Sequence, residues 1–453
     1  MAVSPARLAA FNILLRVERE AAYAVELLHS SLLEELQPLD RNLATEIVMG
    51  VLRWRSVLDG LIARLSFTPF RKLDLEVLIA LRIGIYQKQF LSKVPAHAAV
   101  NESVELVKQA KKVSAAPLVN AVMRKVKSAA YDPRAARPAG IDYLSSALAH
   151  PKWLAERWTD QFGSDQASLI CEYDQRVPPT VLRLSAVEDE RWLGEQGIQL
   201  SPGALLNTAR VVTSGDLSAT TLPATTALPT ATALPKDGRI AIQDEGSQLV
   251  AALVGNGRRI LDCCAAPGGK TAAMATRLPE AEIVATELHP HRARLLRTLA
   301  PQPNVQVLTA DALNLPYGAE FDRVLADVPC SGTGTLARNP EIKWRLKPED
   351  LGDLETRQIA ILRAAMRYLA SGGRLVYSTC SLEPEENEQV VSACLKAESG
   401  FQIIPVRDAL AQLQKSGELV WPNIDQLVSG NFLRTLPGVH PCDGFFAAIL
   451  EKS

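Results

Sequence analysis

The spacing of hydrophobic residues separates a helical front from the rest of the chain. Over residues 5–130, apolar side chains recur every three or four positions, which is the period of an amphipathic helix. Pro38, Pro69 and Pro95 mark breaks in this pattern. The expected helices cover residues 8–17, 24–36, 43–52, 58–65, 77–90 and 100–107. The front of the chain is therefore predicted to be all helical.

After residue 240, short apolar runs alternate with helix-forming stretches. The expected strands lie at the start of residues 240–250, at 260–261, 283–287, 305–308 and 321–326, in the run 373–380 that ends with a cysteine, and at 443–450. Strands that alternate with helices are typical of βαβ units, in which the strands are parallel. We expect an α/β Rossmann-like domain with a doubly wound, mostly parallel sheet.

Between these parts the pattern is weaker. Residues 131–140 are rich in Pro, Ala and Arg and are predicted to be a linker. Residues 217–235 form a biased Thr/Ala/Leu/Pro stretch, which we expect to be a flexible loop. The predicted domains are an all-helical one (1–135), a small connecting α/β one (141–240) and the Rossmann-like one (241–453).

Composition narrows the class of protein. The chain has 453 residues, 47% of them hydrophobic, which is enough apolar material for several folded domains. No apolar run approaches the ~20 residues needed to cross a bilayer, and the N-terminus lacks the layout of a signal peptide. The seven cysteines include no zinc-like CxxC pair. We therefore expect a cytoplasmic protein without a metal site or a membrane partner, and a monomer.

Charge is distributed unevenly although the net charge is only −1. Residues 1–140 contain 20 Lys and Arg against 13 Asp and Glu, a net of +7. Such asymmetry favours a polyanionic partner, whereas a basic helix face is also commonly just solvated. The densest basic positions are Lys108, Lys111, Lys112, Arg124, Lys125 and Lys127.

One stretch of the last domain carries a ligand-binding pattern. Ile260 and Leu261 are followed by small residues, by Pro267 and two glycines, and then by a helix-forming run from Thr271. A strand, a tight turn and a helix N-terminus are the parts with which α/β proteins hold nucleotide-like ligands. The spacing matches neither G-x-G-x-x-G nor G-x-x-x-x-G-K-[ST], so a nucleotide phosphate is not implied.

Three carboxylates follow at the ends of successive predicted strands. Glu287 lies at the distance from the glycines where such folds bind ribose hydroxyls. Asp311 and Asp327 end the next two strands. This set suits a ligand with a ribose, an adenine amine and a cationic centre.

Two cysteines also stand at strand ends. Cys330 lies in the sequence D-V-P-C-S-G-T-G (327–334), and Cys380 lies in S-T-C-S (378–381). The carboxyl ends of parallel strands share one edge of a sheet, so we expect both thiols to face the same cleft. A single cysteine at a strand end is more often a small core residue. Two cysteines with such flanking sequences, facing one cleft, favour a catalytic role.

A thiolate, an acid and a fold for a methyl donor suggest one reaction, the transfer of a methyl group to carbon 5 of a pyrimidine. Carbon 5 of a pyrimidine becomes nucleophilic only after a thiolate adds at carbon 6, which is covalent catalysis. The addition needs a proton on ring nitrogen 3, a task for a carboxylic acid such as Asp327. Release then needs loss of the carbon-5 proton and expulsion of the thiol. The base must be unpaired or flipped out, because carbon 6 is inaccessible within a stack.

Two resemblances agree with this interpretation. The sequence V-P-A-H-A-A-V-N-E-S-V-E-L-V-K (94–108), with N-A-V-M-R-K (120–125), resembles the helical NusB-type RNA-binding domain. The run 264–270, the Cys330 loop and the Cys380 strand end resemble the cytosine-5 RNA methyltransferases of the RsmB (Sun/Fmu) type, which modify small-subunit (16S) ribosomal RNA. The resemblance covers nearly the whole chain.

The resemblance implies a role for each matching residue. Cys380 would be the nucleophile and Cys330 would assist release of the product. Asp327 would be the third catalytic residue. Glu287 departs from many relatives, which carry Asp there. S-adenosylmethionine would be held by Cys264, Ala265, Ala266, Pro267, Gly268, Gly269, Lys270, Glu287, Asp311 and Asp327, with Lys270 near its carboxylate and near Asp327.

Other functions and other roles stay open at this point. The same chemistry could act on transfer RNA, or the chain could be a catalytically silent RNA-binding or antitermination module, or a nucleotide-dependent oxidoreductase. Residues 338–345 mix cations with Trp344 and suit either RNA contacts or a packed tryptophan among solvated cations. Residues 383–388 are expected to be the acidic first turn of a helix.

Overall fold

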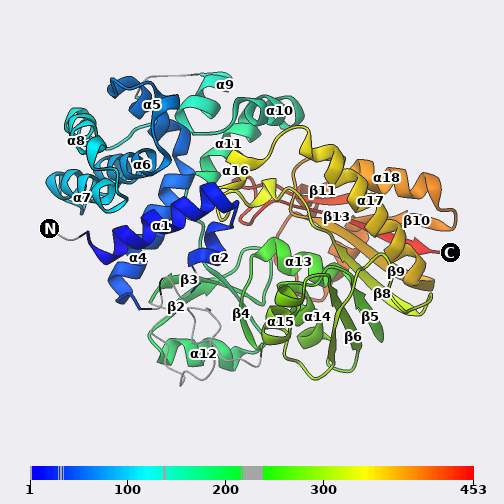
Figure 1. Ribbon diagram of the computed structural model, residues 1–453. Coiled ribbons are helices and arrows are strands. Elements are labelled where there is room, and N and C mark those ends of the chain that lie inside the picture. Colours follow the sequence, from blue (N-terminus) through cyan, green and yellow to red (C-terminus); the bar gives the residue numbers. More distant parts are fainter. Residues whose placement is uncertain are drawn as a thin grey trace. The chain divides into compact units, whose positions relative to one another are not determined.

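The computed structural model describes residues 3–28, 30, 33, 35–135, 139–215, 217 and 238–453, in which the chain forms two compact units (Figure 1). The helical unit contains the described residues up to Val177 together with Leu336–Arg345. The α/β unit contains the other described residues. Apart from Leu217, the predicted loop 217–235 lies outside the described residues. The three domain boundaries drawn from the sequence stay predictions.

The helical unit confirms the all-helical front. Helix α4 begins at Pro38, and Pro95 immediately precedes α7, because proline fits the first turn of a helix but not its interior. The helices are α1 (Pro5–Glu20), α2 (Ala24–Leu28), α4 (Pro38–Arg53), α5 (Arg55–Leu65), α6 (Leu75–Phe90), α7 (Ala96–Gln109), α8 (Ala116–Lys125), α9 (Gly140–Asp142), α10 (Lys152–Phe162), α11 (Ser164–Asp174) and α16 (Ile342–Arg345).

Helix α6 is the central helix of this unit. It is apolar on nearly every side, and Ile79, Leu81, Ile83 and Ile85 are fully buried. A Cβ atom added at Gly84 would lie 2.2 Å from the Ser103 hydroxyl, so the glycine permits α6 and α7 to approach closely.

The α/β unit contains a small sheet with the strand order β2-β3-β1-β4, all neighbours being antiparallel. Its elements are β1 (Val181–Leu184), α12 (Val187–Glu195), β2 (Gln199–Pro202), β3 (Ala209–Ser214) and β4 (Ile240–Ile242). The strand expected at the start of residues 240–250 is β4. It pairs with β1 in this small sheet, where Leu182 lies opposite Ile242 in an antiparallel ladder.

The large sheet has nine strands in the order β11-β12-β13-β9-β8-β5-β6-β7, with β10 paired to β13. The run from β9 to β7 is parallel, which confirms the doubly wound fold, and β10 to β13 add antiparallel pairs at one side. The strands are β5 (Arg259–Asp262), β6 (Glu282–Glu287), β7 (Val305–Thr309), β8 (Phe321–Asp327), β9 (Leu369–Thr379), β10 (Phe401–Ile404), β11 (Val428–Ser429), β12 (Phe432–Thr435) and β13 (Phe445–Lys452).

Helices cover both faces of this sheet (Figure 1). Alternate strand residues point to opposite faces, so Ile260 packs with one helix layer and Leu261 with the other. One layer contains α13 (Glu245–Leu253), α14 (Gly269–Arg277) and α19 (Val406–Lys415), and the other contains α17 (Asp350–Tyr368) and α18 (Glu388–Ala397). Helix α15 (Pro290–Leu299) packs beside α14 and β6.

Candidate functional site

The strand order reverses between β5 and β8, which places a topological switch point at their carboxyl ends. From β5 the chain proceeds through β6 to β7 on one side, and from β8 to β9 on the other. Open α/β sheets bind ligands in the crevice at such a point. The run Cys264–Lys270 follows β5 and the Cys330 loop follows β8, so both motifs meet at this edge.

Lys270 and Asp327 form an ion pair at the switch point. The Lys270 Nζ atom lies 2.7 Å from Asp327 Oδ2, and the Ser378 hydroxyl donates to Oδ1 at 2.7 Å. Burial acts to lower the pKa of Lys270, but the attraction of Asp327 outweighs it and the pKa is raised. Lys270 is therefore a fixed positive charge, and its predicted proximity to Asp327 is confirmed.

Cys330 and Cys380 are brought together although 50 positions separate them in the sequence. Their Sγ atoms lie 3.3 Å apart. The backbone also joins the two segments, because Gly334 N donates to Cys380 O at 2.9 Å. The hydrogen bond with Cys380, together with burial, raises the pKa of the Cys330 thiol. Cys330 is thus a protonated thiol at neutral pH, in contact with the second sulfur.

The segment between β5 and α14 is a tight turn that leads directly into the N-terminus of a helix. Gly268 has φ +121°, a conformation that few other residues adopt, and α14 begins at the next residue. Asp262 is buried at the end of β5 and accepts a hydrogen bond from Thr271 at 2.7 Å. Burial raises the pKa of Asp262 to about 7, and the Thr271 hydrogen bond opposes this shift.

The two remaining predicted carboxylates differ in their surroundings. Glu287 ends β6, is 5% exposed, and accepts from His289 N at 2.9 Å. Asp311 is exposed after β7, two strands from β5, and its Oδ1 accepts from Leu313 N at 3.0 Å. A cation at Lys270 and acceptors at Glu287 and Asp311 fit a ligand with a carboxylate, ribose hydroxyls and an amine.

Sequence reasoning missed Glu386 at this site. Residues 383–388 were expected to be the acidic first turn of a helix, but α18 begins only at Glu388, and Pro384–Glu386 form a separate 3₁₀ turn, η5. Glu386 is fully buried and accepts from Ser331 N at 2.8 Å. The available signal was an acidic residue six positions after a candidate catalytic cysteine.

The segment 336–345 is part of the helical unit, and the cations of Lys343 and Arg345 are held by backbone carbonyls, unlike the solvated cations of one alternative. Lys343 is 1% exposed and donates to Arg53 O at 3.0 Å. Trp344 Nε1 donates to Leu52 O at 2.6 Å, and Arg345 donates to the carbonyls of Val17 and Ala22. These cations anchor the segment to backbone carbonyls.

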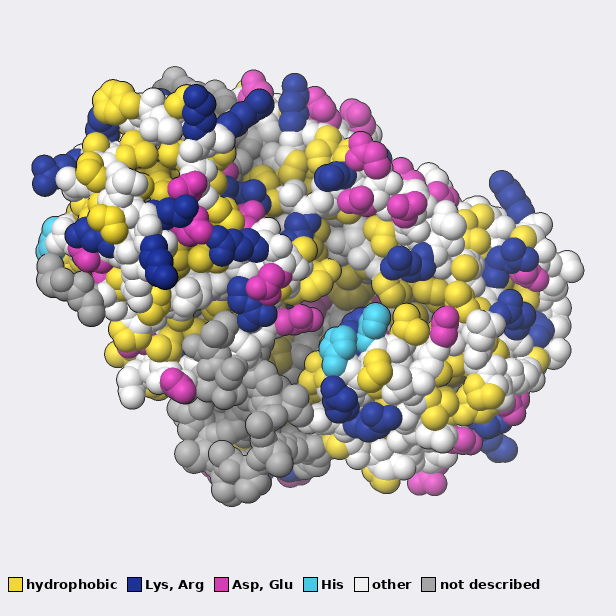
Figure 2. Space-filling model, viewed as in Figure 1, with side chains coloured by type: hydrophobic (Ala, Val, Ile, Leu, Met, Phe, Trp, Pro, Cys, Tyr) yellow, Lys and Arg dark blue, Asp and Glu magenta, His cyan; other side chains and the backbone are white. Residues whose placement is uncertain are grey.

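The basic positions of α7, of α8 and of the segment between them are partly paired. Lys108 lies 2.7 Å from Glu105, and Lys112 lies 2.9 Å from Asp74. Figure 2 shows Lys and Arg side chains of the helical unit interspersed with acidic and hydrophobic ones on the face in view. The structure thus offers scattered positive charge on this face.

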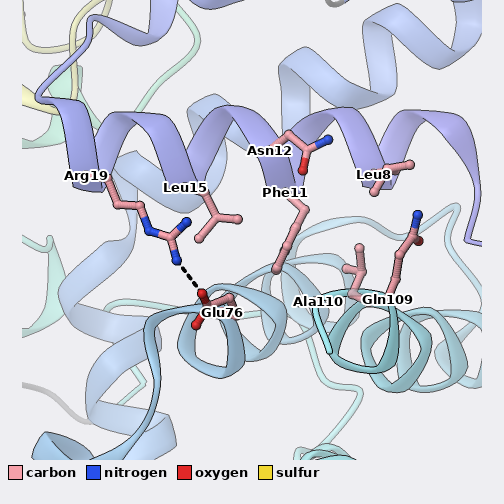
Figure 3. A pocket seen from close by; sticks show the side chains of 9 residues that line it. Leu8, Phe11, Asn12, Leu15, Arg19, Glu76, Gln109 and Ala110 are labelled. Carbon is pink, nitrogen blue, oxygen red and sulfur yellow. Dashed lines mark hydrogen bonds and ion pairs between the residues drawn. The ribbon is translucent and has the colours of Figure 1, made fainter. Parts of the chain in front are cut away.

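A hollow of about 350 Å³ in the helical unit is lined by α1, α6 and α7 (Figure 3). Phe11 and Leu15 point into it, and an ion pair between Arg19 and Glu76 lies at one end. Across the described ranges, no His, Cys, Asp and Glu side chains gather in threes as metal ligands would. Nor does any helix of those ranges have the length and apolarity to cross a membrane.

Known protein families match each of the two units. The family described as 16S rRNA methyltransferase RsmB/F matches residues 251–451, and the NusB family matches residues 4–128. The probable ribosomal RNA small subunit methyltransferase B of Bacillus subtilis is 30% identical, over 98% of this chain and 98% of its own. The ribosomal RNA small subunit methyltransferase B of Pseudomonas syringae pv. tomato is 33% identical over 94% and 93%.

The crystal structure of PH0851 superimposes with a TM-score of 0.79 at 22% identity, covering 100% of both chains, and shows the same fold. A methyltransferase family match over the α/β unit supports S-adenosylmethionine as the cofactor, as the sequence predicts. The full-length identity to methyltransferase B relatives and the two family matches lead to one assignment: the chain belongs to the 16S rRNA methyltransferase RsmB/F family and carries a NusB-type domain at its front.

Proposed function

We propose that this protein methylates carbon 5 of a cytosine in small-subunit ribosomal RNA, with Cys380 as the nucleophile. The observation that carries the proposal is the 3.3 Å approach of the Cys330 and Cys380 sulfurs at the switch point. The relatives named as ribosomal RNA small subunit methyltransferases support the choice of RNA.

The chain's own groups divide the work as follows. The Cys380 thiolate adds to carbon 6 of a flipped-out cytosine, while Asp327 places a proton on nitrogen 3. Lys270 Nζ donates to Asp327 at 2.7 Å and thereby fixes the position of that carboxyl group. Cys330 contacts Cys380 and is placed to assist when the carbon-5 proton leaves and the thiol is expelled.

S-adenosylmethionine, when bound, supplies the methyl group as an electrophilic sulfonium. We propose that the residues Cys264–Lys270, Glu287, Asp311 and Asp327 hold it, with Lys270 facing its carboxylate. The backbone conformation at Gly268 lets a ligand approach the turn closely. Glu287 and Asp311 would accept hydrogen bonds from the ribose and the adenine amine.

The helical unit is proposed to bind the RNA substrate. Its excess of seven positive charges over residues 1–140 and its match to the NusB family support this role. We further propose that the division into domains 1–135, 141–240 and 241–453 reflects RNA binding, connection and catalysis.

The deciding experiment compares wild type, Cys380→Ala and Cys330→Ala with tritiated S-adenosylmethionine and unmodified small-subunit RNA. Cys380→Ala should transfer no methyl group. Cys330→Ala should accumulate a protein–RNA adduct that survives a denaturing gel. Full activity in Cys380→Ala would overturn the mechanism, and label found only in transfer RNA would overturn the substrate.

A further inference from the structure

Glu386 contacts the loops of both cysteines. Its Oε1 accepts from Ser331 N at 2.8 Å and from Gln358 Nε2 at 2.9 Å. Its Oε2 accepts from the hydroxyls of Ser331 and Ser381. A single carboxylate thereby receives four hydrogen bonds, from three side chains and one backbone amide of the α/β unit.

The two serines are the immediate neighbours of the two thiols. Ser331 follows Cys330 and Ser381 follows Cys380, and the serine hydroxyls lie 3.0 Å apart. Because each serine is joined to its cysteine by a single peptide bond, the position of one loop against the other depends on this contact. The same contact between the two loops therefore determines the 3.3 Å distance between the sulfurs.

The chemistry of the cluster requires an acceptor at this position. Glu386 is 0% exposed, and a buried carboxylate is tolerated only where hydrogen bonds replace its lost hydration. An ionised carboxylate accepts about four hydrogen bonds and donates none, which matches the four donors aimed at it. A residue that merely filled space would leave those donors without a partner.

Glu386 is itself firmly placed by the sheet. Its backbone carbonyl accepts from the Tyr377 hydroxyl at 2.6 Å, and Tyr377 is fully buried in β9. Helix stabilisation is served by a different residue, since Glu388 stands in the first turn of α18 and pairs with Arg434. The Glu386 side chain is therefore directed to the cysteine loops rather than to the helix.

We propose that Glu386 is a positioning residue that holds the Cys330 and Cys380 loops in register, so that the two sulfurs stay within contact. The catalytic significance of this role rests on the proposed function. The placement of the two sulfurs does not, and it is measurable without RNA or cofactor.

The test is the rate at which diamide joins Cys330 to Cys380. The oxidant takes two electrons and two protons from the two thiols, an S–S bond forms, and diamide is reduced to the hydrazine. The product is counted as the peptide pair cross-linked through these cysteines by mass spectrometry. In Glu386→Ala we expect this rate to fall about tenfold per folded molecule, because an ångström of misplacement costs large factors in such reactions.

Variants separate register from stability. Glu386→Gln keeps an acceptor for Ser331 N and can donate to the serine hydroxyls, so its rate should return to within about threefold of wild type. Ser381→Ala removes one hydroxyl and leaves the Glu386 side chain in place, and it should be slowed to an intermediate rate. Glu398→Gln is the matched control, because it removes the same charge from a surface pair with Arg363 at the far end of α18.

Methyl transfer gives the second measurement. Glu386→Ala should lose kcat by about 100-fold with little change in the KM for the methyl donor, and Glu386→Gln should recover most of it. If Glu386→Ala does not fold, unchanged cross-linking in Ser381→Ala overturns the proposal. Unchanged cross-linking and kcat in folded Glu386→Ala overturn it directly. Wild type that cross-links but never methylates RNA refutes the proposed function alone.

Discussion

Two lysines with little solvent exposure, one in each unit, have pKa values that shift in opposite directions. Lys270 of the α/β unit has a side chain 13% exposed and a carboxylate at 2.7 Å. Lys343 of the helical unit is 1% exposed and donates to the Arg53 carbonyl at 3.0 Å. Both belong to stretches that the sequence marks as candidates for ligand or RNA contact.

Their pKa values shift in opposite directions. Burial is the leading influence on both, but the ion pair with Asp327 raises the pKa of Lys270 above its usual value. Burial lowers the pKa of Lys343 to about 7, and the Coulombic attraction of Asp174 only partly offsets it. A buried lysine thus keeps its charge where a carboxylate contacts it directly, and this separates a candidate ligand-binding cation from a packing residue.

The largest expected effect comes from removing each lysine in turn. Lys270→Met takes away the positive charge beside Asp327 and should reduce kcat/KM for methyl transfer by about 100-fold or more. Lys343→Met is the matched change in the helical unit and should stay within about threefold of wild type, because Lys343 touches backbone and no reacting group. Equal losses of kcat/KM in the two variants would contradict the distinction between a ligand-binding lysine and a packing lysine.

The candidate site was predictable where its motifs are local. The strand, turn and helix around Gly268 follow from a run of small residues after Leu261, and the strand ends at Asp327 and Thr379 follow from short apolar runs. The parallel sheet then brings Cys330 and Cys380 to one edge. These steps need only the period of side chains and the topology of βαβ units.

The rest depends on pairings between distant positions. From the sequence alone Glu386 is predicted to be an acid in the first turn of a helix, but its partner Ser331 lies 55 positions earlier. Lys343 is predicted to be a surface cation, but Arg53, which accepts its hydrogen bond, lies 290 positions earlier. The paired strands β1 and β4 are separated by the stretch 217–235, which has no hydrophobic periodicity. No local pattern of charge or hydrophobicity encodes such contacts.

A pH series sharpens the comparison. The folded pKa of Lys343 is about 7 against 10.5 for an ordinary lysine, so between these values the unfolded chain binds more protons and stability rises with pH. The slope is at most about 1.4 kcal/mol per pH unit. Between pH 7.5 and 9.5, the melting temperature of wild type should therefore rise by a few degrees relative to Lys343→Met.

Lys270→Met is the control for that series. Because the pKa of Lys270 is raised, the residue is charged in both the folded and the unfolded state over this pH range, and its removal should leave the pH dependence parallel to wild type. Parallel curves for Lys343→Met as well would show that Lys343 is charged in the fold, and the contrast between the two lysines would fail.

The smallest effect is expected at Trp344, next to Lys343. Trp344→Phe removes the Nε1 hydrogen bond to Leu52 O, which is 2.6 Å long, and should destabilise the protein by about 1 kcal/mol. The melting temperature should fall by a few degrees. Affinity for small-subunit RNA, measured by filter binding well below that temperature, should not change, because the indole nitrogen is already engaged by the backbone. A loss of RNA affinity at unchanged melting temperature would instead place Trp344 at the RNA surface, and the segment 336–345 would then be a binding element rather than an anchor.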